Sequence, residues 1–250
     1  MAGPKIDALG QFSLTTGLGP LGRAVDFTNS NEAMLAAAAI IVLVFALGLR
    51  AQALVPGRTQ ALVEVLYEFV RDMCVDTIGD EGMRFFPLVF TIFSFILLGN
   101  LLGLFPYFFA FTSHIAVTLT LALFVFLFST GVGFYTHGLR FLKFFVPAGV
   151  PVWLLPLLIP IEFISYLSRP VSLSVRLFAN ITAGHVMWEV FAGFMLLLAA
   201  SFGVLGAVAA LVPLGLNVAL VALELLVAGL QAYVFAILTC LYLHDAVHMH

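Results

Sequence analysis

Residues 161–185, IEFISYLSRPVSLSVRLFANITAGH, decide how the rest of the chain is interpreted. This stretch lies inside a long apolar region, and yet it carries an arginine, Arg176, between the apolar residues Val175 and Leu177. An arginine near the middle of a bilayer costs at least ~2.5–3.5 kcal/mol on insertion scales, so it is rare unless it has a function. Arg176 is therefore the first candidate for a functional residue.

The composition places the chain in a membrane. Of its 250 residues, 63% are hydrophobic and 9% are charged, whereas a soluble domain has about 25% charged residues. A soluble fold could not hide so much apolar surface from water. The net charge of −3 provides no basic surface for nucleic acid. The two cysteines, Cys74 and Cys240, are far apart and imply neither a disulfide framework nor a metal site.

Apolar runs predict an all-α polytopic membrane protein, with an N-terminal tail at 1–32 and a single membrane domain at 33–250. No signal-peptide core precedes residue 33, so the spans themselves are expected to direct insertion. Two or three runs suit upright transmembrane helices, because about 20 apolar residues cross the hydrocarbon core. The last two runs are too long for one upright crossing and contain no polar loop, which favours a pair of long, strongly tilted helices. The expected upright spans are 33–55, 85–107 and 114–137, and the expected tilted helices are 147–198, with Arg176, and 203–243, with Glu224.

Residues 59–80 differ from the spans, because apolar and acidic residues both recur there with a helical period. The residues expected on the apolar face are Leu62, Val65, Leu66, Phe69 and Met73. The acidic stripe consists of Glu64, Glu68, Asp72, Asp76 and Asp80. This pattern predicts an amphipathic helix that lies on the membrane surface. The stripe is typical either of a solvated face or of a surface that meets a basic partner.

Basic residues set the expected orientation of the chain. They are concentrated in two connections: Arg50, Arg58, Arg71 and Arg84 lie between the first two spans, and Arg140 and Lys143 follow the third. The link at 108–113 contains no lysine or arginine. Both basic connections are therefore expected in the cytoplasm, which places the N-terminus outside and the C-terminus in the cytoplasm.

Polar residues form a row on each of the two long helices. On the first helix, the members step by three or four and share a broad face: Glu162, Ser165, Arg169, Ser172, Arg176 and Asn180. On the second helix, the members step by seven: Asn217, Glu224 and Gln231. His185, nine residues after Arg176, points in a different direction. Two such rows indicate a shared aqueous path that is interrupted at Arg176.

The residues around this arginine resemble the a subunit of the F-type ATP synthase membrane sector. SVRLFAN matches the RLFxN signature of that family, with Arg176 at its essential arginine and Asn180 at its asparagine. Glu162, Gln231 and the Asn100 of GNLLGLFPY match further family positions. The resemblance covers most of the chain, and the ordered set of motifs is far more specific than RLF alone.

At two positions, the residue types resemble those of the α-proteobacterial and mitochondrial members of the family. His185 and Glu224 stand where many bacterial members have glutamate and histidine, respectively. The exchange makes sense if the two side chains face each other and relay one proton together. Gly103 stands where some members have an aspartate, so no role in proton handling is expected there.

The resemblance implies a stator with two offset proton half-channels beside a rotating ring of c subunits, in a bacterial inner membrane. Arg176 would separate the half-channels and attract the carboxylate of the ring. The outer half-channel would contain Asn100, Asn180, His185, Glu224 and Gln231, and the inner one Glu162, Ser165 and Ser168. The implied partners are the c-ring, the b-type subunits of the peripheral stalk and the rest of the synthase. No catalytic chemistry in this chain, no cofactor and no metal are implied.

Two other classes of membrane protein fit the sequence less well. A polytopic secondary transporter would carry inverted repeats, and no convincing repeat is found. A haem protein would need facing histidine pairs, and only His185 lies well inside a span.

Arg169 is expected to anchor or pack, and Glu189 is either a second partner of His185 or a surface residue. The histidines at the C-terminus, whose spacing could suit a metal but more readily suits a tail without a role, are His244, His248 and His250.

Overall fold

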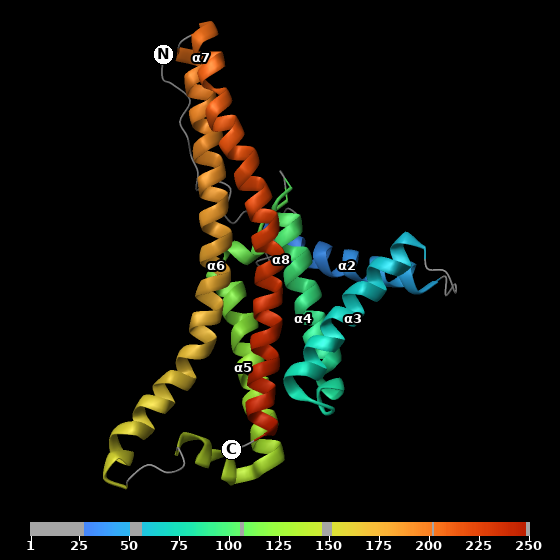
Figure 1. Ribbon diagram of the computed structural model, residues 1–250, viewed down its shortest axis with the longest axis vertical. Helices are drawn as coiled ribbons and strands as arrows, with labels where there is room; N and C mark the ends of the chain where they lie inside the picture. The colour runs from blue at the N-terminus through green and yellow to red at the C-terminus, as the bar shows by residue number, and fades with distance from the viewer. Residues whose placement is uncertain (1–27, 51–56, 106–107, 147–151, 202, 249–250) are drawn as a thin grey trace. The chain divides into compact units, whose positions relative to one another are not determined.

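The computed structural model describes residues 28–50, 57–105, 108–146, 152–201 and 203–248, and Figure 1 shows its helices. Within this part, every element longer than a single bridge is helical, which confirms the expected all-α class. The α-helices are α2 (Asn29–Arg50), α3 (Arg58–Ile78), α4 (Gly82–Gly103), α5 (Ile115–His137), α6 (Leu155–Ser201), α7 (Gly203–Ala209) and α8 (Leu211–Val247). Short 3-10 helices are η2 (Phe111–Ser113), η3 (Gly138–Phe145) and η4 (Val152–Leu154). Most of the expected tail, the expected ends of two spans at 55 and 107, and the expected start of a long helix at 147 lie outside the described residues.

Among the described residues, five helices are long and apolar enough to cross a membrane. Three of these spans have 21 to 28 residues, a length that suits one crossing. The fourth, α6, is one unbroken helix of 47 residues, although Pro160 and Pro170 lie inside it. The last apolar run is divided instead, because α7 ends at Ala209 and α8 begins at Leu211. The chain is therefore a multi-pass membrane protein, while the strong tilt of its long helices stays a prediction.

The chain divides into two compact units. The first unit comprises Met1–Ile41, Phe95–His114 and Leu177–Gln231, and the second comprises Val42–Ser94, Ile115–Arg176 and Ala232–His250. Four of the five boundaries fall inside α2, α4, α6 and α8, so each of these helices contributes residues to both units, and the fifth lies just before α5.

Aromatic side chains join α3 to its neighbours in the second unit. The rings of Tyr67 and Phe86 on α4 meet edge to face, with their centroids 4.7 Å apart. The ring of Phe69 lies 5.7 Å from that of Phe93 on α4 and 5.9 Å from that of Tyr233 on α8. Aromatic pairs of this kind contribute about 0.5–1.5 kcal/mol beyond the area that they bury. The amphipathic helix is therefore attached to the spans at several points.

The helix α3 has three faces rather than the two that were predicted. The face that packs on the protein consists of Val63, Val70, Met73, Cys74 and Ile78. Three members of the predicted apolar face are exposed, namely Leu62 (54%), Val65 (63%) and Phe69 (44%). The acidic stripe defined above is exposed along its whole length. Met73 thus packs on the protein while these three residues are left open, because helical period does not distinguish the two kinds of apolar face, and contact of α3 with the membrane surface stays a prediction.

The two cysteines meet in the second unit, although 166 residues separate them in the sequence. The Sγ atoms of Cys74 on α3 and Cys240 on α8 are 3.8 Å apart, and both free thiols are buried. Nothing in the spacing of the two residues predicts this contact. It provides a further point at which the amphipathic helix is held against the last span.

A glycine in α5 permits the close return of the chain after that helix. A Cβ atom on Gly133 would lie 2.7 Å from Cδ2 of Phe141, which is buried in η3. We expect Gly133→Ala to lower the free energy of unfolding by about 1–3 kcal/mol, the usual cost of overpacking. Gly131→Ala is the matched control, because a Cβ there meets nothing within 4 Å. Thermal unfolding midpoints of the purified chain in detergent measure the difference, and equal midpoints in the two variants would contradict the packing described.

Candidate functional site

The residues predicted to line the outer half of the aqueous path all belong to the first unit. They come from three helices: Asn100 on α4, Asn180 and His185 on α6, and Glu224 and Gln231 on α8. Asn100, His185 and Gln231 are buried, with exposed fractions of 2%, 4% and 3%. Polar side chains so far from solvent normally have hydrogen-bond partners, so their contacts indicate what the site can do.

Two amides of this set link neighbouring helices. Asn180 donates from Nδ2 to Oε1 of Gln231 over 3.2 Å, which joins α6 to α8. Asn100 donates from Nδ2 to the carbonyl oxygen of Ala228 over 3.4 Å, which joins α4 to α8. The Oδ1 atom of Asn100 is buried and has no hydrogen-bond partner among the described residues. Asn100 thus forms a bond between helices and still offers an acceptor.

Glu224 approaches the helix that carries His185 very closely. Its carboxyl group packs against the backbone of Gly184, where an added Cβ would overlap Oε1 and lie 2.9 Å from Cδ. Both carboxylate oxygens are buried, and neither has a hydrogen-bond partner in the described part of the chain. A buried carboxyl group needs a proton, a cation or water as its partner. Such a group is suited to exchanging a proton.

His185 on α6 lies near the end of α4. A Cβ atom on Gly103 of α4 would be 3.8 Å from Nε2 of His185, an ordinary van der Waals contact, so Gly103 borders the imidazole. The ring centroid of Trp188 is 6.2 Å from that of His185. The structure therefore places Glu224 against Gly184, the residue before His185. The side chains of Glu224 and His185 form no hydrogen bond with each other. Their predicted relay stays a prediction.

The residues predicted for the inner half of the path are in the second unit. Glu162 is half-buried, and Ser165 and Ser168 are exposed. The hydroxyl group of Ser168 donates to the carbonyl oxygen of Ser165 over 2.7 Å, within the same helix. Arg176 is exposed and makes no ion pair with any described residue. Its charge is therefore not neutralised by an ion pair within the described residues.

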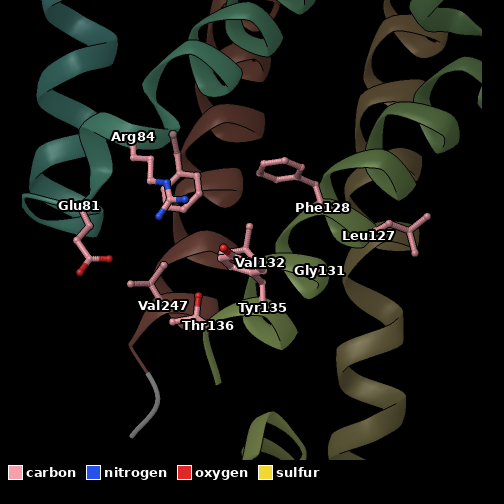
Figure 2. A pocket seen from close by; sticks show the side chains of 10 residues that line it. Glu81, Arg84, Leu127, Phe128, Gly131, Val132, Tyr135, Thr136 and Val247 are labelled. Carbon is pink, nitrogen blue, oxygen red and sulfur yellow. The ribbon is translucent and has the colours of Figure 1, made fainter. Parts of the chain in front are cut away.

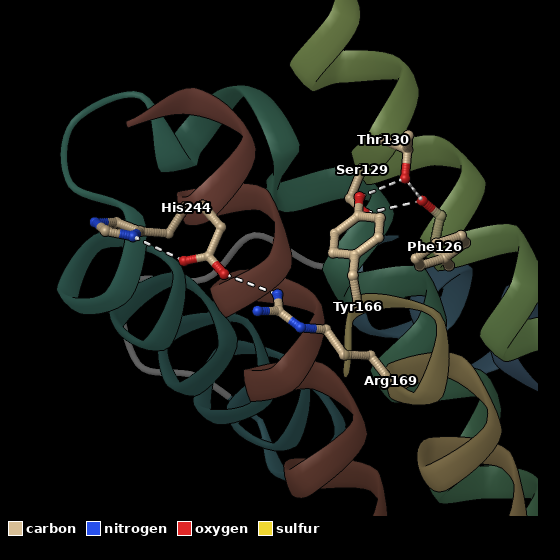
Figure 3. Close-up of polar contacts among 7 residues, drawn as sticks. Phe126, Ser129, Thr130, Tyr166, Arg169 and His244 are labelled. Carbon is tan, nitrogen blue, oxygen red and sulfur yellow. Dashed lines mark hydrogen bonds and ion pairs between the residues drawn. The ribbon is translucent and has the colours of Figure 1, made fainter. Parts of the chain in front are cut away.

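A second polar cluster, drawn in Figure 3, involves a residue that the sequence did not single out. Nη1 of Arg169 pairs with Oδ2 of Asp245 at 2.9 Å. The guanidinium carbon lies 5.4 Å from the ring centroid of Tyr166 and 5.5 Å from that of Tyr242. The hydroxyl group of Tyr166 is 2.6 Å from that of Thr130 on α5. The expected packing role of Arg169 is confirmed, because these contacts join α5, α6 and α8.

The C-terminal histidines show no metal-ligand arrangement in the part of the chain that the structure describes. The rings of His244 and His248 are stacked with their centroids 4.8 Å apart. The described residues contain no group of three or more His, Cys, Asp or Glu side chains that could hold a metal ion. His250 lies outside them.

Comparison with known proteins gives consistent matches over nearly the whole chain. The model of the family described as "ATP synthase A chain" matches residues 33–244. A protein of Acidiphilium cryptum named "ATP synthase subunit a" is 72% identical over 245 residues, and the match covers 98% of each chain. Proteins of the same name from Granulibacter bethesdensis and Gluconobacter oxydans are 61% and 58% identical. These matches cover 100% and 98% of this chain, and 99% and 98% of the two relatives.

Proposed function

Since the chain belongs to the ATP synthase A chain family, we propose that it is the stator that offers two offset proton half-channels to the c-ring. As a member of this family, the chain is the proton-translocating subunit of the membrane sector and is not itself a catalytic subunit. The family match over residues 33–244 is the observation that carries the proposal. The gathering of five polar residues in one compact unit supports it.

In the proposed outer half-channel, protons reach the ring through the polar set of the first unit. Glu224 supports this role, because its buried carboxyl group has no hydrogen-bond partner among the described residues. His185 directly follows Gly184, the residue against which the carboxyl group of Glu224 packs. A histidine titrates near neutral pH, so it passes protons on rather than merely holding them. Asn100, Asn180 and Gln231 would orient water and the acidic group of the ring.

Arg176 is the proposed separator between the half-channels. Its exposure and its lack of an ion pair within the described chain support a role toward an acidic partner. At about 4 Å and an effective dielectric constant of 20, opposite charges attract by about 4 kcal/mol. This attraction favours the ionised form of the arriving acid, which releases its proton toward Glu162, Ser165 and Ser168.

The neutral form of the ring acid explains how proton flow drives rotation. An ionised carboxylate entering hydrocarbon meets a large desolvation cost, whereas a protonated one does not. Each ring acid would therefore leave the stator only after it has received a proton from the outer side. Each unit charge that crosses 100 mV supplies about 2.3 kcal/mol to this cycle.

The proposed assembly contains the c-ring, the b-type subunits of the peripheral stalk and the rest of the synthase, in the inner membrane of a bacterium. The names of the relatives support membership in such a complex. The basic residues between the spans support an outer N-terminus and a cytoplasmic C-terminus. The acidic stripe on α3 is exposed along its length, which leaves it open to a basic partner as well as to water.

Cross-linking to the ring tests the proposal. Ser172 and Val171 are adjacent and exposed on α6, but they lie about 40° and 140° around the helix from Arg176. We expect Ser172→Cys, and not Val171→Cys, to form a disulfide with a cysteine placed beside the ring carboxyl, in a complex that co-purifies with ring and stalk subunits. The unmodified chain controls for its native thiols. Purification without a ring, together with transport of a solute, would support the alternative of a secondary transporter.

A further inference from the structure

A cleft of about 880 Å³ opens in the second unit at a point where three membrane helices end (Figure 2). Its walls come from the start of α4, the last turns of α5 and the last residue of α8. Membrane helices end where the hydrocarbon core gives way to headgroups and water. The cleft therefore lies at the level of the lipid headgroups. Its lining includes Glu81, Arg84, Leu127, Phe128, Tyr135 and Thr136.

One side of the cleft is apolar and open. Leu127 is 65% exposed and Phe128 is 37% exposed, and both lie on α5 toward the membrane interior from Tyr135. Gly131, between them and the end of the helix, has nothing within 4 Å of the place where a Cβ would be. An apolar surface of this kind in a membrane protein is suited to hydrocarbon chains.

The rim of the cleft carries two opposite charges. Glu81 and Arg84 are both exposed, and the backbone N–H of Arg84 donates to the carbonyl oxygen of Glu81 over 3.1 Å. Their side chains form no ion pair with each other or with any other described residue. Tyr135, which is 85% exposed, and Thr136 add hydroxyl groups to the same rim. A cation and an anion thus stand about one helical turn apart, each available to a ligand.

We propose that this cleft binds one phosphatidylethanolamine molecule of the bilayer. The guanidinium group of Arg84 would hold the phosphate, since its fixed fork of donors matches phosphate oxygens. The carboxylate of Glu81 would accept hydrogen bonds from the primary ammonium group. The acyl chains would follow Leu127 and Phe128 toward the membrane interior. The site depends only on the membrane location of the chain and not on the proton path proposed above.

The opposite charges of Arg84 and Glu81 favour this lipid over other occupants of the cleft. An anionic phospholipid would satisfy Arg84, but its net charge would be repelled by Glu81. A quaternary ammonium headgroup has no N–H to donate to that carboxylate. A helix of another subunit would remove both charges from water, and desolvating an ion pair is costly even when it is well paired. A zwitterionic primary amine satisfies both charges and leaves them at the aqueous boundary.

Lipid retention by the purified synthase in nanodiscs tests the proposal. Nanodiscs with equal parts of phosphatidylethanolamine, phosphatidylcholine and phosphatidylglycerol are used, and native mass spectrometry counts the lipids that stay on this chain. The unmodified chain should retain phosphatidylethanolamine preferentially. Arg84→Gln should reduce that retention about tenfold, which corresponds to the loss of one charge-assisted hydrogen bond. Glu81→Gln should remove the preference over phosphatidylglycerol.

Arg140→Gln is the matched control, because Arg140 is exposed on η3 and does not line the cleft. Its lipid retention should equal that of the unmodified chain. Equal retention of the three lipids by the unmodified chain, or no effect of Arg84→Gln, would overturn the proposal. A photoreactive phenylalanine analogue at Leu127 gives an independent measurement in the assembled synthase. An adduct with the mass of phosphatidylethanolamine supports the site, and an adduct with another subunit refutes it.

Discussion

Arg176→Ala is expected to abolish ATP synthesis and to let protons leak passively through the membrane sector. Without the guanidinium group, about 4 kcal/mol of attraction for a ring carboxylate is lost at the separation considered above. The barrier that keeps the two half-channels apart is lost with it. Both effects are expected to be large, because no ion pair within the described residues competes for the charge of Arg176.

The measurement uses reconstituted vesicles, in which ATP synthesis and the decay of an imposed pH gradient are followed together. Arg176→Lys should also fail, since a lysine loses its proton when buried far more readily than an arginine does. Arg71→Ala is the control, because Arg71 is exposed on the amphipathic helix and away from the polar rows. Full coupling in Arg176→Ala would show that the residue does not separate the half-channels.

The second large effect is expected for the proposed proton relay between His185 and Glu224. Either residue alone, changed to alanine, should reduce the rate of proton-driven ATP synthesis at least about 100-fold, the lower end of the range for the loss of a positioned proton-transfer group. The double exchange His185→Glu with Glu224→His should retain more activity than either His185→Glu or Glu224→His alone. It keeps one carboxyl group and one imidazole in the same buried region beside Gly184.

Rates of synthesis in the single and exchanged variants, measured in vesicles at equal proton-motive force, check this expectation. Glu32→Gln serves as the control, because Glu32 is an exposed carboxyl group in the first turn of α2 and belongs to neither polar row. If the exchanged variant failed as completely as the two single ones, direct pairing of the side chains would be refuted. The family assignment would be unaffected by that result.

The helices could be predicted well because each apolar run is a local property of the sequence. The all-α class, the amphipathic helix near 59–80 and the unbroken helix around Arg176 follow from composition, period and the absence of a polar loop. The break between α7 and α8 at Ala210 did have a signal, because Pro213 in the first turn of α8 has no backbone N–H to donate to the carbonyl group of Ala209. The membership of the family followed from a few spaced motifs around Arg176.

Contacts between distant residues could not be predicted in the same way. The thiols of Cys74 and Cys240, and the ion pair between Arg169 and Asp245, depend on how α3 and α6 pack against α8. Asp245 did have a signal in the sequence, because it is the one carboxylate near the end of the last apolar run. The approach of Glu224 to Gly184 had none, since a glycine carries no side chain whose chemistry could indicate a neighbour.

The length of α6 has one more consequence. With 47 residues, the helix is about 70 Å long, and it would fit inside a hydrocarbon core of about 30 Å only by leaning about 65° from the membrane normal. Successive residues of the helix would then be separated mainly along the membrane plane rather than across the membrane. An acid carried past in the plane of the bilayer would meet Asn180, Arg176 and Ser172 one after another. An acid on a ring that turns clockwise would meet these three residues in one order, and an acid on a ring that turns anticlockwise would meet them in the reverse order.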